Sequence, residues 1–282
     1  MVAENERLLS EMEHGYYVYG VVAGDGWPAA EGPMAGIDLA YPLYTLSHQA
    51  IQAVVSKVSL REFGQESLEA RINDAEWLTA KVCAHESILE TISAGRAVIP
   101  MRFCSIYNSE GRVREMLAQH YDDFVANLAR LEGKREWGIK VYFDESRLAD
   151  GIEQISDRVK ELKAEMATKS AGAAYILRKK LDAATSEEIE RVSNECAQRG
   201  HDRLSSHAVQ STLTALRDRQ LTGRRDEMIL NGAYLVVEGQ LAVFRGELER
   251  LQGDYGDLGF SFEMTGPWPP FNFVTIGSGD VA

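Results

Sequence analysis

His85 and Glu86 are the adjacent residues whose types come nearest to those of a metal-dependent hydrolase. The HExxH motif needs a second histidine one helical turn after the first, so that both imidazoles face one ion. Position 89 is Leu, which removes that ligand. Because His85 lies in an apolar helical stripe, we expect a core histidine with a local hydrogen-bond partner rather than a metal ligand. His120 has the same position in its own helix, and we expect the same of it.

The sequence offers no convergent set of acid, base and nucleophile. Cys83 and His85 are two residues apart, so on a helix their side chains do not face one another. The glycine-dense stretches at residues 24–26 and 277–279 do not join a strand to a helix, as a phosphate cradle must, and we interpret both as turns. The sequence therefore predicts no catalytic residue, no cofactor site and no metal site.

Two basic clusters stand out in an otherwise acidic chain, at residues 178–180 (Arg-Lys-Lys) and 224–225 (Arg-Arg). We interpret the first as a solvated helix face and the second as a turn. The alternative interpretation is a positively charged contact surface for an acidic partner.

Trp268 is the centre of a different kind of segment, because prolines lie on both sides of it. A Pro-rich aromatic segment that is held extended can pack on its own domain or dock into a partner at low entropic cost. Packing on its own domain is the preferred interpretation. If the segment instead docks, the candidate partner-binding residues are Trp268, Pro269, Pro270 and Phe271.

Composition limits the classes of function. The chain has 282 residues, enough for two ordinary domains, with 30 basic and 43 acidic residues and a net charge of -13. This balance argues against a nucleic-acid partner, which needs a clustered positive surface. No apolar run approaches the length of a membrane span, and the first fourteen residues are acidic. Three scattered cysteines fit a reducing compartment, so we expect a cytoplasmic protein.

The hydrophobic periods of the first half predict an α+β domain that must position His85 and His120. Strands are expected over residues 16–22, 43–46, 51–58 and 97–103, and amphipathic helices over residues 66–94 and 109–131. The buried stripe of the first helix comprises Leu68, Ile72, Ala75, Leu78, Val82, His85, Leu89 and Ile92. The inner face of the second helix comprises Val113, Leu117, His120, Phe124, Leu128 and Leu131. Gly133 and Lys134 then break the pattern, which marks the domain boundary.

The second half predicts a modified ferredoxin-like domain. Strands are expected over residues 137–143, 208–213, 227–237 and 258–264, and helices over residues 152–166, 171–204 and 241–255. Apart from the extra short helix, this order is βαββαβ, an antiparallel sheet with two helices on one face. Prolines at 267, 269 and 270 cannot continue a ladder, so the chain should leave the sheet there. We expect a flexible tail over 1–14, domains over 15–134 and 135–268, and an extended C-terminal tail over 269–282.

The order of short strings along the chain resembles the GvpL/GvpF family of gas vesicle proteins. The most specific strings are 221–224 (LTGR), 227–236 (EMILNGAYLV) and 265–274 (TGPWPPFNFV). Others follow the family order from the N-terminus: 17–22 (YVYGVV), 53–56 (AVVS), 62–64 (EFG), 76–78 (EWL), 85–86 (HE), 98–103 (VIPMRF), 136–142 (EWGIKVY) and 172–180 (GAAYILRKK). The resemblance covers residues 15–274 and departs from the family at residues 1–14, in an insert at 27–34 and at Ser170.

The resemblance implies a non-enzymatic, minor structural or assembly protein of the gas vesicle. It implies binding to the small hydrophobic shell protein (GvpA-type) and a link to other gas vesicle accessory proteins. It further implies a chaperone-like role in assembly and a place on the gas-facing surface. The alternative, from another class, is a ligand-sensing regulatory module or enzyme on ferredoxin-like domains. An enclosed pocket with convergent polar groups would favour that alternative, and an open apolar groove would favour the gas vesicle protein.

Overall fold

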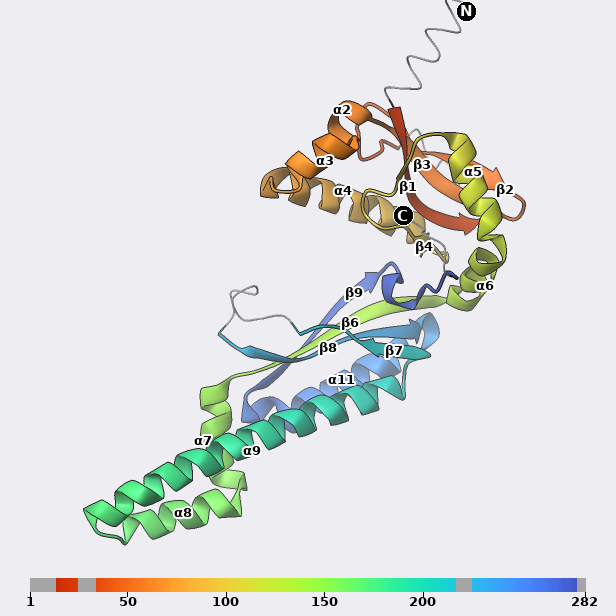
Figure 1. Ribbon diagram of the computed structural model, residues 1–282. Helices are drawn as coiled ribbons and strands as arrows, with labels where there is room; N and C mark the ends of the chain where they lie inside the picture. The colour runs from red at the N-terminus through yellow and green to blue at the C-terminus, as the bar shows by residue number, and fades with distance from the viewer. Residues whose placement is uncertain (1–13, 25–33, 217–224, 278–282) are drawn as a thin grey trace, which may run out of the picture. The chain divides into compact units, whose positions relative to one another are not determined.

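The computed structural model describes residues 14–24, 34–216 and 225–277, which fall into two compact units (Figure 1). The first unit contains the chain up to Lys134 and the residues from Trp268 onward, and the second contains Arg135–Pro267. Some features of the sequence lie outside the described residues: the tail 1–13, Asp25 and Gly26, most of the insert 27–34, the string 221–224, and Ser278 and Gly279.

The first unit is built on a sheet with the strand order β2-β3-β1-β4, and β5 also pairs with β1. Its strands are β1 (His14–Ala23), β2 (Tyr44–His48), β3 (Ile51–Ser59), β4 (Ile99–Pro100) and β5 (Ile106–Tyr107). The structure confirms the first three predicted strands, which are rich in aromatic and β-branched residues. The fourth, predicted over 97–103, is only two residues long, and the chain turns at Phe103 and Cys104, where the φ of Cys104 is 63°.

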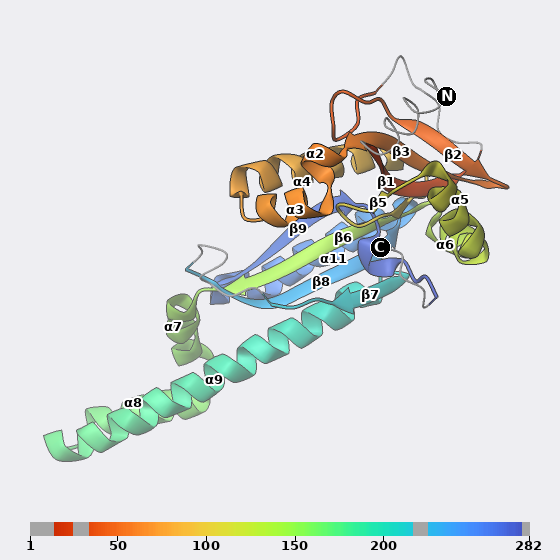
Figure 2. The same cartoon turned by 45° about the horizontal axis from the view of Figure 1, so that its top comes forward.

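Helices lie on both sides of this sheet (Figures 1 and 2). They are α2 (Leu60–Phe63), α3 (Gln65–Arg71), α4 (Ala75–Ser93), α5 (Glu110–Gln119) and α6 (Tyr121–Leu131). On one side, Ile88, Leu89 and Ile92 of α4 form a core with Tyr17 and Tyr19 of β1. On the other side, α5 and α6 contact β1 and β3.

The predicted helix over 66–94 is wrong as one continuous element. The chain breaks between α3 and α4, where the Asp74 side chain accepts hydrogen bonds from the amides of Glu76 (3.2 Å) and Trp77 (3.1 Å). An N-cap aspartate of this kind starts a new helix in a new direction. Ile72, assigned to the buried stripe, is consequently 62% exposed.

The predicted helix over 109–131 is also divided, at His120, whose φ of -109° and ψ of 19° are not helical. The expected inner face is nevertheless buried on both pieces, α5 and α6. The apolar period therefore continued through a break that hydrophobicity alone does not reveal.

The second unit has a sheet with the strand order β7-β8-β6-β9 (Figure 1). Its strands are β6 (Lys134–Phe143), β7 (Gln210–Leu213), β8 (Glu227–Val237) and β9 (Phe260–Trp268), so the first and last predicted strands are neighbours in one sheet. Its helices are α7 (Glu145–Ile155), α8 (Asp157–Ala167), α9 (Ala171–Ser205) and α11 (Leu241–Tyr255), with short 3-10 turns η1 (Glu238–Gln240) and η2 (Gly256–Leu258). Helices α9 and α11 cover one face of this sheet, and α8 runs beside the first half of α9 (Figure 2).

The predicted helix over 152–166 is two helices in the structure. The Ser156 hydroxyl accepts a hydrogen bond from the Val159 amide (3.4 Å) and starts α8, while α7 begins earlier, after the cap at Asp144. Serine and aspartate at N-caps supply the acceptors that the first helical amides lack.

The end of the second sheet also differs from expectation. We expected the last strand to end at Met264, but β9 continues through Pro267 to Trp268. Because β9 lies at the edge of the sheet, Pro267 can be accommodated without removing a ladder bond from a central strand. Residues 271–273 form a 3-10 turn, η3 (Phe271–Phe273), and the chain from Trp268 onward groups with the first unit instead of forming a separate tail.

Candidate functional site

The C-terminal segment, residues 268–277, lies against α6. Three polar side chains of α6 hold it: Asp123, Asn127 and Arg130, spaced four and three residues apart and therefore on one face of the helix. The Asn127 side-chain amide donates to the carbonyl of Thr275 (2.7 Å), and its oxygen accepts from the Thr275 amide (3.3 Å). Arg130 donates to the carbonyl of Phe273 and, at 2.7 Å, to the Asn127 side-chain oxygen.

These contacts recognise the backbone of the segment rather than its side chains. The Asp123 carboxylate accepts from the Gly277 amide at 2.9 Å, which extends the pattern along the segment. The Phe273 side chain is buried, so an apolar anchor accompanies the polar contacts. The sequence prediction missed the polar face of α6; its only signal was Asn127, a polar residue one helical turn before Leu131 of the apolar stripe.

The four predicted partner-binding residues differ in solvent exposure. Pro269 and Pro270 are buried, whereas Trp268 is 39% exposed and Phe271 is 38% exposed. The preferred sequence interpretation, packing of this segment on the second domain, is corrected: the segment packs on the first unit. Both large aromatic residues therefore remain partly exposed to solvent.

A second candidate is an apolar groove within the first unit, with a volume of about 760 Å³. Helices α2 and α3, the start of α4 and the chain around β5 form its walls. Its lining includes Leu60, Phe63, Leu68, Ile72, Trp77, Leu78, Phe103 and Ile106. A groove of this size and composition is typical of a binding site for an apolar group. The sequence prediction assigned Leu68, Ile72 and Leu78 to a buried helical stripe, so it did not identify them as an open surface.

Two charged groups next to the groove lining, Glu62 and Lys81, pair with each other. The Trp77 indole donates to the Glu62 carboxylate at 2.7 Å, and Lys81 forms an ion pair with the same carboxylate at 3.1 Å. Burial raises the pKa of Glu62, but the hydrogen bonds from Trp77 and Lys81 outweigh it and lower the pKa below its ordinary value. The Lys81 ammonium also lies 5.1 Å from the centre of the Phe63 ring.

A buried polar chain fixes one wall of the groove. The Cys104 amide donates to the Tyr17 hydroxyl at 2.9 Å, and that hydroxyl lies 2.9 Å from Nδ1 of His85. The Tyr17 hydroxyl thus links the chain at Cys104 to the buried imidazole of His85. Burial lowers the pKa of His85 to about 4, so the ring is neutral at pH 7. The prediction of a hydrogen-bonded core histidine is confirmed.

The other residues that were considered for chemistry lie in environments without a catalytic arrangement. Cys83 is exposed while His85 is buried, so they form no nucleophile and base pair. His120 is buried against the Phe124 ring, with 6.0 Å between ring centres. Among the described residues, no group of His, Cys, Asp or Glu has the arrangement of a metal site. In the same part of the chain, no helix is long and apolar enough to cross a membrane.

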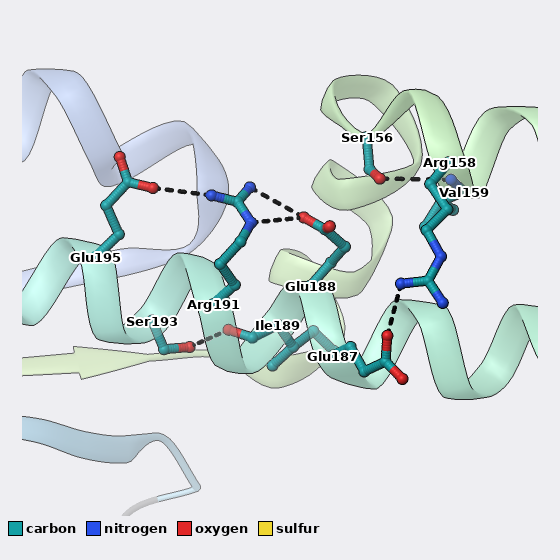
Figure 3. Close-up of polar contacts among 9 residues, drawn as sticks. All are labelled: Ser156, Arg158, Val159, Glu187, Glu188, Ile189, Arg191, Ser193 and Glu195. Atoms are coloured by element: carbon teal, nitrogen blue, oxygen red, sulfur yellow. Dashed lines mark hydrogen bonds and ion pairs between the residues drawn. The ribbon is translucent and has the colours of Figure 1, made fainter.

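The basic cluster at 178–180 lies on the exposed surface of α9. Lys179 sits 5.3 Å from the centre of the Tyr175 ring. Farther along α9 the charges pair with one another: Arg191 contacts Glu188 and Glu195, each at 2.9 Å (Figure 3). The first basic cluster is thus an exposed helix face, as interpreted. Of the second cluster, Arg224 lies outside the described residues.

A family model, curated relatives and a solved structure all relate this chain to gas vesicle proteins of the F and L types. The family model described as "Gas vesicle synthesis protein GvpL/GvpF" matches residues 15–275. Gas vesicle protein L of a Streptomyces species is 30% identical over 241 residues, 85% of this chain and 86% of that protein. Gas vesicle protein L1 of Halobacterium salinarum is 24% identical and covers 96% of this chain and 93% of its own. The crystal structure of gas vesicle protein GvpF from Anabaena has a TM-score of 0.67 at 18% identity, over 93% of this chain and 98% of that one.

Proposed function

Because the chain belongs to the GvpL/GvpF family of gas vesicle proteins and so has a role in gas vesicle formation, we propose that it binds the small hydrophobic shell protein and assists its assembly. The observation that carries this proposal is the family match over residues 15–275. Shell subunits that present a water-repelling surface aggregate unless their apolar faces and strand edges are covered before polymerisation. A factor that covers them would act as a chaperone.

Two features of the surface support this proposal over a ligand-sensing module or an enzyme. The groove of the first unit is lined mainly by apolar side chains and is open to solvent, and no set of acid, base and nucleophile converges among its lining residues. Trp268 and Phe271 add exposed aromatic surface, and aromatic residues are frequent anchors of protein interfaces. We therefore propose a non-catalytic binding protein without a cofactor, placed on the gas-facing surface of the vesicle.

The second unit offers a different contact mode. Its order of strands and helices supports the interpretation of a modified ferredoxin-like domain, with α7 and α8 as additional helices. Strand β7 lies at the edge of the sheet, and Leu213 at its end is 58% exposed. An edge strand can add a strand from a partner, so β-augmentation by the shell protein is proposed here as a supplementary contact.

Co-purification tests the proposed function. The full chain is co-expressed with tagged shell protein, recovered at about 0.05 and 0.5 M salt, and then sought in washed, intact vesicles. Apolar contact predicts a loss of less than about tenfold with salt, because screening weakens exposed charges and leaves apolar burial intact. No retention of the wild-type chain at either salt concentration would contradict the proposal.

Trp268→Ala tests the predicted anchor, with Asn127→Ala as the matched variant. As a binding anchor, Trp268 should contribute about 2 kcal/mol to binding, while its partial exposure predicts a smaller effect on unfolding. Asn127→Ala removes two backbone contacts of the C-terminal segment and leaves the indole intact. Equal loss of stability in both variants, with unchanged binding, would show that Trp268 is a packing residue.

A further inference from the structure

We infer that the groove of the first unit is the docking site for an amphipathic segment of the partner protein, with an aliphatic or aromatic face and lysine or arginine along its border. The inference rests on the proposed function for the identity of the partner. It goes beyond that function in naming the site and the chemistry of the bound segment.

The apolar face of the partner follows from the lining. Ile72 at the rim is 62% exposed, and Trp77 and Leu78 beside it are only half-buried. Their exposure is costly in water, and it is relieved when an apolar surface covers them. Two cations next to the lining are already engaged, since Lys81 pairs with Glu62 and the Arg71 guanidinium lies 5.7 Å from the centre of the Trp77 ring.

The basic border of the partner follows from the acidic rim. Glu69 lines the groove, and its carboxylate accepts a hydrogen bond from the neutral side chain of Gln65 at 3.2 Å. Glu66 and Glu76 do not line the groove, but they are exposed in the first turns of α3 and α4, the helices that form this wall. None of the three acidic residues forms an ion pair with another residue inside the described ranges. A basic border on the partner would complete these charges, and the net charge of -13 would speed its approach.

The groove is also preformed, which favours binding. Phe63 at its base is 1% exposed, and the hydrogen bonds from Cys104 to Tyr17 and from Tyr17 to His85 hold the opposite wall. A partner therefore gains the apolar contact without first ordering the site.

Ile72→Asp tests the apolar part in the full chain co-expressed with tagged shell protein. We expect at least a tenfold loss of co-purification, because a charge would be buried in the interface. Leu39→Asp is the matched control: Leu39 is 83% exposed in the same unit and does not line the groove, so its change should alter binding less than twofold. Circular dichroism checks that both variants fold.

Glu69→Lys tests the border. We expect a severalfold loss of binding at about 0.05 M salt and less than a twofold loss at 0.5 M, since screening removes the new repulsion. Glu90→Lys, exposed on α4 away from the groove lining, is the control and should bind like the wild type.

The outcomes separate the two levels of the proposal. Retention of the wild type with unchanged binding by Ile72→Asp and Glu69→Lys would overturn the groove and leave the proposed function standing. Equal losses for Ile72→Asp and Leu39→Asp would also overturn it, because they would indicate unspecific apolar contact. Absence of wild-type binding would overturn both. A loss by Ile72→Asp, with Leu39→Asp unaffected, supports the groove.

Discussion

The groove of the first unit and the hairpin formed by α8 and α9 in the second both expose large apolar side chains, but their surroundings differ. In the groove, Ile72 and Trp77 line a concave surface of about 760 Å³ backed by a buried polar chain. On the hairpin, Tyr175 and Ile176 are 63% and 60% exposed on the surface of α9, near the basic residues 178–180. In a concave surface, several apolar side chains can contact one partner and lose their water together. On an exposed helix surface, they contact a partner one at a time.

Charge is used differently in the two regions as well. The exposed acidic rim of the groove stays without an ion pair inside the described ranges, as an interaction surface would. The hairpin pairs its charges along and across its helices, as between Arg158 and Glu187 at 2.6 Å (Figure 3). Exposed apolar area indicates a docking surface only when shape and unpaired charge agree with it.

Among these variants, Phe63→Ala should give the largest loss of unfolding free energy. A small loss would contradict the contrast between the groove and the hairpin. Phe63 is 1% exposed between the groove and the core, so its truncation should lower the unfolding free energy of the first unit by about 3 to 5 kcal/mol. Tyr175→Ala on the hairpin should change the unfolding free energy by less than about 0.5 kcal/mol. Denaturant unfolding of each variant measures both values, and similar losses would show that the groove is no more deeply built than the hairpin.

Acid should weaken the first unit through the wall of the groove. The pKa of His85 is about 4 in the folded state, against about 6.5 for an unfolded histidine. Between these values the unfolded state binds more protons, so stability rises with pH there and is lost as pH falls from 6.5 to 4, by about 3 kcal/mol. His85→Gln keeps a partner for Tyr17 without this titration. The difference in unfolding free energy between wild type and variant should shrink as pH falls, and a constant difference would contradict the assigned neutral histidine.

Arg203→Ala tests an ion pair of the second unit that, unlike the exposed pairs of the hairpin, includes a nearly buried carboxylate. Near the C-terminal end of α9, Arg203 contacts Glu247 at 2.5 Å, and the Glu247 side chain is only 8% exposed. Its removal leaves a nearly buried carboxylate with Arg250 as its remaining partner, so we expect a loss of about 2 kcal/mol in unfolding free energy. Arg203→Lys should recover part of that loss, and no loss in Arg203→Ala would place this ion pair with the exposed ones.

Arg191→Ala should have the smallest effect. The Arg191 side chain is 58% exposed, although it contacts two glutamates. Solvent screening limits exposed pairs of this kind to about 0.5 kcal/mol. Thermal unfolding at about 0.05 and 0.5 M salt gives the value, and a loss above about 1.5 kcal/mol would mean that the hairpin depends on its surface charges more than the comparison allows.

The sequence by itself determined the elements whose signal is local. β-branched and aromatic runs located β1, β3 and β8, and apolar residues at helical spacing located the inner faces of α5, α6 and α9. The order of the short strings pointed to the family, which the comparisons show. These signals depend on a residue and its near neighbours in the chain, so they can be read without a structure.

Only the tertiary structure decided where helices break and what the C-terminal segment contacts. The caps at Asp74 and Ser156 compete with a continuing apolar period, and their success depends on where the next helix can pack. Asn127 and Thr275 are 148 residues apart, and their hydrogen bonds have no local sequence signature. The groove likewise exists because α3 and α4 diverge at Asp74, which converts a predicted buried stripe into an open apolar surface.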